Sequence, residues 1–130
     1  MATSRKYLAF DIETAKEVPG DFSQWRSHRP LGIICAATCA SDAEPKLWHS
    51  TSDGKPAPRM SQPDVQQLVA YLTIMASQGY TILTWNGAGF DFDVLAEESN
   101  SLEECRACAH DHVDMMFHLV CALGYGIGLA

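Results

Sequence analysis

Apolar and polar residues alternate along the first 50 residues in the two-residue rhythm of β-strands. The pattern predicts strands over residues 6–12, 31–40 and 45–50, and the short turn between the last two favours an antiparallel meander. Between the first two strands, residues 14–30 are polar and irregular. The N-terminal part of the chain therefore predicts three strands of one sheet.

A helical rhythm begins after a loop rich in proline and glycine at residues 51–60. Ser61 is placed to cap a helix with Asp64 three residues later, and Gly79 is placed to end it. A strand follows over residues 80–85, and because a helix precedes it, we expect it to run parallel to an earlier strand. The remaining predicted elements are helices over 90–98, 102–109 and 116–123 and a brief strand at 112–115.

This order of elements predicts an α/β protein. Its sheet should be mixed, with an antiparallel three-strand meander, an added parallel strand and flanking helices. No repeat, low-complexity tract or linker divides the sequence, so residues 1–130 are interpreted as a single domain.

The composition fits a globular protein and bears on its cellular location and on its binding partners. The chain has 130 residues, of which 47% are hydrophobic, and it has neither an apolar run of membrane-spanning length nor a signal peptide. Its five cysteines are irregularly spaced, which favours free thiols and a cytoplasmic location. The net charge of −7 argues against a broad basic face for nucleic acid, although not against an enzyme that grips a few nucleotides.

Two acids stand at the end of the first predicted strand, in YLAFDIET. Asp11 and Glu13 are two residues apart, so their side chains point to the same face of the strand. Adjacent carboxylates repel unless one is protonated or a cation lies between them. The pair therefore predicts a divalent metal, with ordinary surface acids as the alternative.

A third acid follows the later strand, in WNGAGFDFDVL. If that strand lies beside the first, the turn at residues 86–89 brings Asp91 to Asp11 and Glu13. Carboxylate oxygens suit Mg²⁺ or Mn²⁺, and two such ions can support phosphodiester cleavage. An acid favoured by a helix N-terminus is the simpler interpretation of Asp91.

Together these motifs resemble the DEDD-type 3′–5′ exonucleases of the DnaQ-like superfamily, which includes the proofreading domains of family B DNA polymerases. The family's D-x-E matches Asp11 and Glu13, and its N-x-x-x-(F/Y)-D matches Asn86, Phe90 and Asp91. The resemblance implies an RNase H-like fold and metal-dependent hydrolysis from the 3′ end of single-stranded DNA or RNA. It also implies that the three acids are catalytic ligands of two Mg²⁺ or Mn²⁺ ions.

Several nearby residues are candidates for binding the substrate. Asn86 and Phe90 belong to the second motif, with an ordinary turn residue as the alternative for Asn86. Thr14 follows the acid pair, and Trp25 and Arg26 lie in the aromatic and basic stretch FSQWRSHR, which could stack bases and hold phosphates. A packed Trp25 beside solvated arginines is the alternative.

The family's third motif, which supplies a fourth carboxylate and a Tyr or His, is matched poorly. His110 and Asp114 have the wrong context, so we expect a C-terminally incomplete domain that is a weak or inactive nuclease. Two further hypotheses are a non-catalytic RNase H-like module that binds nucleic acid or protein, and an RNase H-type endonuclease.

Two C-terminal patterns carry further hypotheses. The segment CRACAHDH offers zinc ligands, but the overlapping helix signal favours two half-buried thiols and surface imidazoles. The apolar end of the chain predicts a homodimer formed through it. Its residues are Met115, Phe117, Leu123, Tyr125, Ile127 and Leu129.

Overall fold

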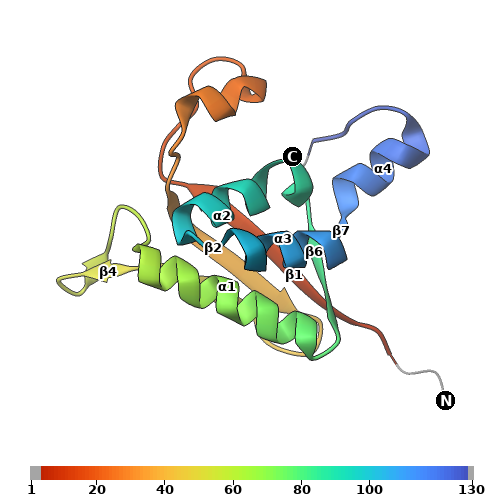
Figure 1. Ribbon diagram of the computed structural model, residues 1–130, viewed down its shortest axis with the longest axis horizontal. Helices are drawn as coiled ribbons and strands as arrows, with labels where there is room; N and C mark the ends of the chain where they lie inside the picture. The colour runs from red at the N-terminus through yellow and green to blue at the C-terminus, as the bar shows by residue number, and fades with distance from the viewer. Residues whose placement is uncertain (1–3, 129–130) are drawn as a thin grey trace.

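The fold is built on a five-stranded sheet with the strand order β3-β2-β1-β6-β7 (Figure 1). It is seen in a computed structural model that describes residues 4–128. The strands are β1 (Lys6–Thr14), β2 (Ile33–Ala40), β3 (Lys46–Trp48), β6 (Tyr80–Thr84) and β7 (Val113–Asp114).

Strand pairing confirms the predicted mixed sheet. β1 pairs antiparallel with β2, and β2 pairs antiparallel with β3, which is the expected meander. β6 pairs parallel with β1 on its other side, and β7 extends the parallel part. The long strand β1 therefore lies at the centre of the sheet, with an antiparallel half on one side and a parallel half on the other.

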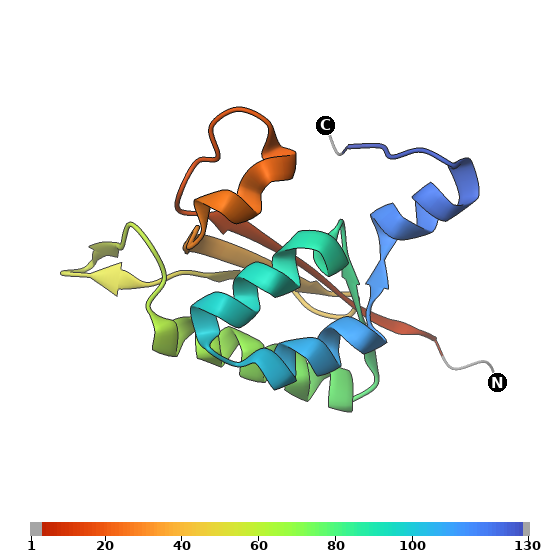
Figure 2. The same cartoon turned by 45° about the horizontal axis from the view of Figure 1, so that its top comes forward.

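Three helices cover one face of this sheet (Figure 2). They are α1 (Gln62–Ser77), α2 (Phe92–Ser99) and α3 (Leu102–Asp111). The core lies between them and the sheet, because alternate residues of β1 point inward to meet the apolar stripes of the helices. On β1 these inward residues are Leu8, Phe10 and Ile12.

The predicted limits of α1 hold in the structure. The Ser61 hydroxyl accepts a hydrogen bond from the backbone N–H of Asp64, at 3.3 Å, as an N-cap does. Asp64 does not complete a capping box, because its carboxylate accepts a hydrogen bond from the buried Ser50 hydroxyl instead. Gly79 ends the helix with a φ of +94°, a conformation that glycine adopts without steric cost.

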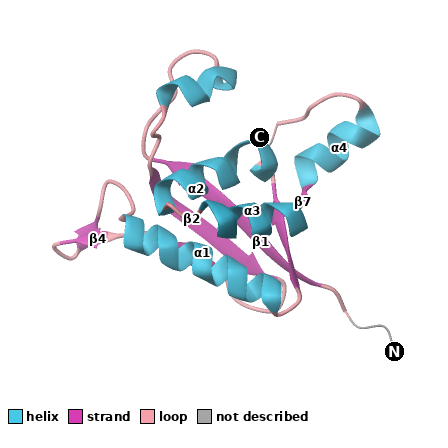
Figure 3. Cartoon of the chain, viewed as in Figure 1, coloured by secondary structure: helices cyan, strands magenta, loops and turns pink. Residues whose placement is uncertain are grey.

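Two segments that the sequence analysis left irregular contain regular structure (Figure 3). Residues Phe22–His28 form a 3₁₀ helix, η1, whose start is capped by the Asp21 carboxylate. The loop before α1 contains a hairpin of β4 (Thr51–Ser52) and β5 (Lys55–Pro56). Asp53 and Gly54 both have positive φ at its tip, so the Asp-Gly pair was the missed turn signal.

The last helix, α4 (Met115–Leu123), has no buried residue and projects from the domain (Figure 1). The sequence analysis predicted an amphipathic helix here, but both its faces are at least partly exposed, and Phe117 is 63% exposed. Leu129, which was expected to extend this apolar segment, lies outside the described residues. Within residues 4–128, no helix is long and apolar enough to cross a bilayer.

Candidate active site

The strand β1 separates core residues from candidate site residues by simple alternation. Asp11 and Glu13 point to the face of the sheet opposite α1, α2 and α3, and both side chains are exposed. Their neighbours on that face, Ala9 on β1 and Ala37 on β2, are also exposed. The acids therefore lie at the end of a central strand, on its open face.

Asp91 reaches the same strand end because the pairing of β6 stops early. The parallel register between β1 and β6 ends at Ala9 and Leu83, which leaves the following part of β1 without a partner on that side. The chain then leaves the sheet, turns, and returns through a single π-helical turn, η2 (Gly87–Asp91). Asp91 at its end meets the vacant edge of β1, where the nearby backbone N–H of Ile12 favours the ionised form of its carboxyl.

The turn depends on residues with special backbone roles. Asn86 has a φ of +64°, a left-handed conformation that asparagine tolerates better than most residues. Gly87 lies so close to Thr84 that a Cβ added at Gly87 would be 2.6 Å from the Thr84 Cβ. The Gly87 N–H donates to the Thr84 hydroxyl at 3.0 Å. The sequence Asn-Gly is therefore required by the path that delivers Asp91.

Asp11 and Asp91 form a close carboxyl pair. Asp91 is only 3% exposed, and its pKa is raised from 3.8 to about 7, with burial as the largest cause. The Asp11 carboxylate contributes to this shift by repulsion and by accepting a hydrogen bond from the protonated form, and the nearby Ile12 N–H opposes it. A divalent cation would remove the repulsion that the proton now relieves, so this pair fits a metal chemically.

Glu13 does not complete a cluster with this pair. Among residues 4–128, no group of three or more His, Cys, Asp or Glu side chains is arranged to hold a metal ion. Glu13 lies two residues, about 7 Å, further along the strand than Asp11. A register irregularity between Glu13 and Thr14 follows at once. Of the three acids, Asp11 and Asp91 are thus the two seen to interact, and the part of Glu13 stays a prediction.

The candidate substrate residues Phe90 and Trp25 belong to one aromatic cluster. Trp25 is 4% exposed, with its ring 5.0 Å from that of Phe90 in an edge-to-face arrangement. Phe22, which the sequence analysis did not select, lies 5.2 Å from Phe90 on the other side and is 51% exposed. The exposed ring of this cluster is therefore Phe22, whereas Trp25 packs in the core.

Arg26 and Thr14 are engaged in local contacts. The Arg26 guanidinium lies 4.5 Å from the Trp25 ring and forms an ion pair with Asp93 at 2.8 Å. It also donates a hydrogen bond to the carbonyl oxygen of Gly89 at 3.3 Å. The Thr14 hydroxyl donates to the backbone carbonyl of Lys16. Arg26 thus fastens η1 to the turn that carries Asp91.

Comparison with known proteins places this geometry in a structural context. No protein-family model matches the chain, and no curated protein matches it. Solved structures do match. An ExoI/SSB-Ct complex superposes with a TM-score of 0.59 at 15% identity, covering 98% of this chain and 32% of that one. E. coli exonuclease I in complex with a dT13 oligonucleotide gives 0.56 at 17% identity, covering 98% and 32%.

A further match is the family B DNA polymerase of the hyperthermophilic archaeon Pyrobaculum calidifontis. It has a TM-score of 0.52 and 19% identity, and the match covers 78% of this chain and 12% of the polymerase. The fold is RNase H-like. The chain spans a third or less of the length of these proteins, so their activities are not carried over by the match.

In this RNase H-like fold, the two residues that could match a third motif lie elsewhere. His110 is exposed on the last turn of α3. Asp114 is 8% exposed, and both its carboxylate oxygens accept hydrogen bonds from backbone N–H groups. Asp114 is absent from the groups that shift the pKa of Asp91. The structure therefore brings neither residue to the Asp11–Asp91 pair.

The zinc alternative also finds no support in the arrangement of the described residues. Cys105 and Cys108 are buried on one face of α3, and burial raises the pKa of the Cys105 thiol to about 12 and that of Cys108 in the same direction. His112 places its ring edge-to-face against Phe92, 4.8 Å between centroids. The cysteines are thus more deeply buried than the half-buried thiols expected, and the His112 ring is packed against Phe92 and not at the surface.

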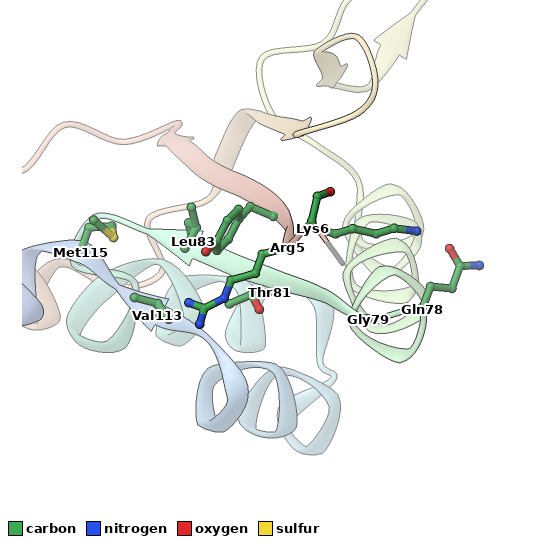
Figure 4. Close-up of a pocket in the computed structure, with 10 residues that line it drawn as sticks. Arg5, Lys6, Gln78, Gly79, Thr81, Leu83, Val113 and Met115 are labelled. Carbon is green, nitrogen blue, oxygen red and sulfur yellow. The ribbon is translucent and has the colours of Figure 1, made fainter. Parts of the chain in front are cut away.

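The open face of the sheet beside the site is hollowed. One hollow of about 400 Å³ is lined by Ala9, Asp11, Cys39 and Trp85 among others. A second of about 780 Å³ continues toward the start of β1 and is drawn in Figure 4, where Arg5 lies near Thr81 and Val113. Both hollows share Leu83 and Met115. A shallow hollowed surface therefore runs along the open face and ends at Asp11.

Proposed function

We propose that this chain is a metal-dependent nuclease domain of the 3′–5′ exonuclease type, acting on single-stranded DNA or RNA. The observation that carries the proposal is the Asp11–Asp91 pair at an open strand end, with Asp91 buried and its pKa raised to about 7. Strongly perturbed carboxyls that meet at the surface of a cleft are typical of functional sites. Exonuclease I and a polymerase among the structural matches support this class.

The proposed roles follow from the placement of each side chain. Asp11 and Asp91 would hold Mg²⁺ or Mn²⁺, and the Ile12 N–H would keep the Asp91 carboxylate aimed at Asp11. A bound divalent ion supplies activation of water and neutralises charge that develops on the phosphate. Glu13 lies next along the same face, where it could join only through a movement of its side chain or of the ion.

Substrate contacts are proposed for the aromatic and turn residues beside the pair. The half-exposed Phe22 ring, supported from beneath by Phe90, is a surface on which a terminal base could stack. Asn86, Phe90, Thr14, Trp25 and Arg26 remain proposed substrate residues from the sequence. The buried Trp25 and the ion-paired Arg26 would act by holding η1 against the turn.

We expect this 130-residue chain to be a weak nuclease or an inactive one. Among the described residues no group of three or more His, Cys, Asp or Glu side chains is arranged to hold a metal ion, and the His or Tyr of the family's third motif has only a poor match in the sequence. A missing general base costs roughly 10²–10⁴-fold in rate. The same observation supports a second candidate, a non-catalytic RNase H-like module that binds nucleic acid.

One assay separates these candidates. The chain is incubated in Mn²⁺ with single strands labelled at the 3′ or the 5′ end, beside an Asp11→Asn variant that keeps the shape of the side chain. Stepwise shortening from the 3′ end that Asp11→Asn abolishes supports the exonuclease. Internal cuts indicate an RNase H-type endonuclease, and binding without cleavage indicates the non-catalytic module.

The homodimer predicted from the sequence remains a proposal about α4. Phe117, Leu123 and Tyr125 are exposed apolar side chains on or beside one projecting helix. Exposed apolar patches of several hundred Å² usually mark interfaces. Light scattering that gives a monomer over a wide range of concentration would contradict it.

A further inference from the structure

Asp114 is bonded more extensively than a helix cap requires. Its Oδ1 atom accepts hydrogen bonds from the backbone N–H groups of Met116 and Phe117, at 3.1 and 3.2 Å, which caps α4. The same carboxylate also accepts from two amides far away in the sequence. Asn86 N–H donates to Oδ1 at 2.9 Å, and Ala88 N–H donates to Oδ2 at 3.2 Å.

The two distant amides belong to the turn that delivers Asp91. Asn86 is the left-handed residue that precedes η2, and Ala88 lies within η2, three residues before Asp91. At its other end the turn is held by the hydrogen bond from the Arg26 guanidinium to the carbonyl oxygen of Gly89, and the Asp91 carboxyl lies close to the Ile12 N–H. Asp114 therefore holds the start of the turn, together with the Thr84 hydroxyl, which accepts from the Gly87 N–H between the two amides.

Backbone pairing alone holds the junction between β7 and the turn that follows β6 weakly. Strand β7 has two residues, and its register with β6 consists of Leu83 with Val113 and Thr84 with Asp114. Past Thr84 the ladder ends, and the carboxylate of Asp114 continues the connection across to Asn86 and Ala88. Hydrogen bonds to a buried ionised carboxylate are stronger than those between neutral groups.

We propose that Asp114 is a positioning residue of the candidate active site. It holds the Asn86–Ala88 turn so that Asp91 stays against Asp11, and through the same carboxylate it ties the start of α4 to that geometry. The positioning of Asp91 is a property of this structure, and its importance for metal binding rests on the proposed function. Asp114 is not a ligand in this scheme, because its oxygens face backbone amides.

Three substitutions separate the two halves of this role. Asp114→Ser keeps an N-cap for α4, since serine caps helices well, but its short side chain cannot span to Asn86 and Ala88. Asp114→Asn keeps the Oδ1 acceptor and replaces Oδ2 by an N–H donor that faces the Ala88 amide. Asp114→Ala removes both halves. Asp111→Ala, an exposed acid at the end of α3, is the control for charge.

Amide hydrogen exchange is the first measurement. In Asp114→Ser we expect the Asn86 and Ala88 amides to exchange about 10–100-fold faster, with α4 amides and the melting temperature close to wild type. In Asp114→Asn the Ala88 amide should respond more than the Asn86 amide. Asp111→Ala should change neither. Wild-type exchange at both amides in Asp114→Ser would overturn the proposal.

Mn²⁺ affinity and a crystal structure of Asp114→Ser complete the test. We expect about tenfold weaker Mn²⁺ binding in Asp114→Ser, as for other residues that orient a ligand, and wild-type binding in Asp111→Ala. Weaker binding with unchanged exchange would mean that Asp114 is itself a ligand, which overturns the proposal. If the wild type binds no Mn²⁺, the proposed function fails. The crystal structure then decides, because Asp91 still seated against Asp11 in the variant would refute a positioning role.

Discussion

The two faces of the central strand β1 differ more than any two parts of this molecule. On one face Leu8, Phe10 and Ile12 are buried under three helices. On the other face Ala9, Asp11 and Glu13 are exposed, and the surface beside them is hollowed. The same nine residues of backbone thus serve stability on one side and candidate chemistry on the other, because side chains alternate.

This difference shows where the fold can place carboxyl groups whose burial or mutual repulsion is unfavourable. Asp11 and Glu13 lie on the open face of the sheet, so their carboxylates remain in contact with water. The electrostatic penalty falls on Asp91, which comes from another element and is buried against the strand edge. A stable core and a repulsive carboxyl pair can therefore coexist one residue apart.

The largest expected effect tests the covered face. Leu8→Ala should lower the free energy of unfolding by about 2–5 kcal/mol, because it leaves a cavity among buried side chains. Leu47→Ala is the matched control, since Leu47 on β3 is an exposed leucine of the same sheet. Urea unfolding followed by circular dichroism measures both. Equal losses for the two variants would mean that the faces do not differ as described.

The next effect tests the carboxyl pair by pH. Since the pKa of Asp91 is raised from 3.8 to about 7, the folded chain binds this proton more tightly than the unfolded chain does. Its contribution to stability is complete below about pH 4 and is lost as pH rises from about 4 to about 7. The expected loss is on the order of 4 kcal/mol. Urea unfolding at a series of pH values measures it.

Two variants control this pH dependence. Asp91→Asn cannot titrate, so its stability should lack the decrease between about pH 4 and 7. Asp53→Asn removes an exposed acid at the hairpin tip, where asparagine tolerates the positive φ, and it should keep the decrease. Mn²⁺ should stabilise the wild type more at about pH 8 than at pH 5, since proton and metal compete for the same carboxyls. An unchanged slope in Asp91→Asn would contradict the assignment to this residue.

The smallest expected effect concerns Phe22, the exposed apolar ring of the aromatic cluster around Phe90. Phe22→Ala should weaken binding of a short single-stranded oligonucleotide about fivefold, since stacking of one base on an aromatic ring contributes about 1 kcal/mol or more. Fluorescence anisotropy measures the affinity. Phe117→Ala on α4 removes an equally exposed phenyl ring and should leave binding unchanged. Loss of binding in Phe117→Ala alone would place the nucleic acid elsewhere.

Much of this arrangement could be predicted from the sequence, because it depends on local rules. The period of two fixed the shared face of Asp11 and Glu13, and the helix between strands fixed the parallel pairing that brings Asp91 near. The antiparallel pairing of the first three strands followed from the same rules, whereas the position of β6 beside β1 was only a condition of the prediction and β7 was expected only as a brief strand. These features need only spacing and connectivity.

The remaining features depend on how far side chains reach and on packing between distant segments. The sequence did not show whether Glu13 would lie close enough to join the Asp11–Asp91 pair, because this depends on where Asp91 meets the strand. The role of Phe22 depends on η1 folding back onto Phe90, which a polar and irregular stretch does not announce. Asp114 holds amides more than 20 residues away, and no local pattern carries that information.

The π-helical turn Gly87–Asp91 makes the site sensitive to chain length. A π-helical turn contains one residue more than an α-helical turn, and each residue of an α-helix rotates the next side chain by about 100°. Loss of a single codon within this turn would let α2 (Phe92–Ser99) continue backward as an ordinary helix, with its core packing intact, while the acid at its start pointed away from β1. Lineages that shortened this turn by one residue would therefore keep the fold and lose the carboxyl pair, a change that leaves no trace in hydrophobic pattern or composition.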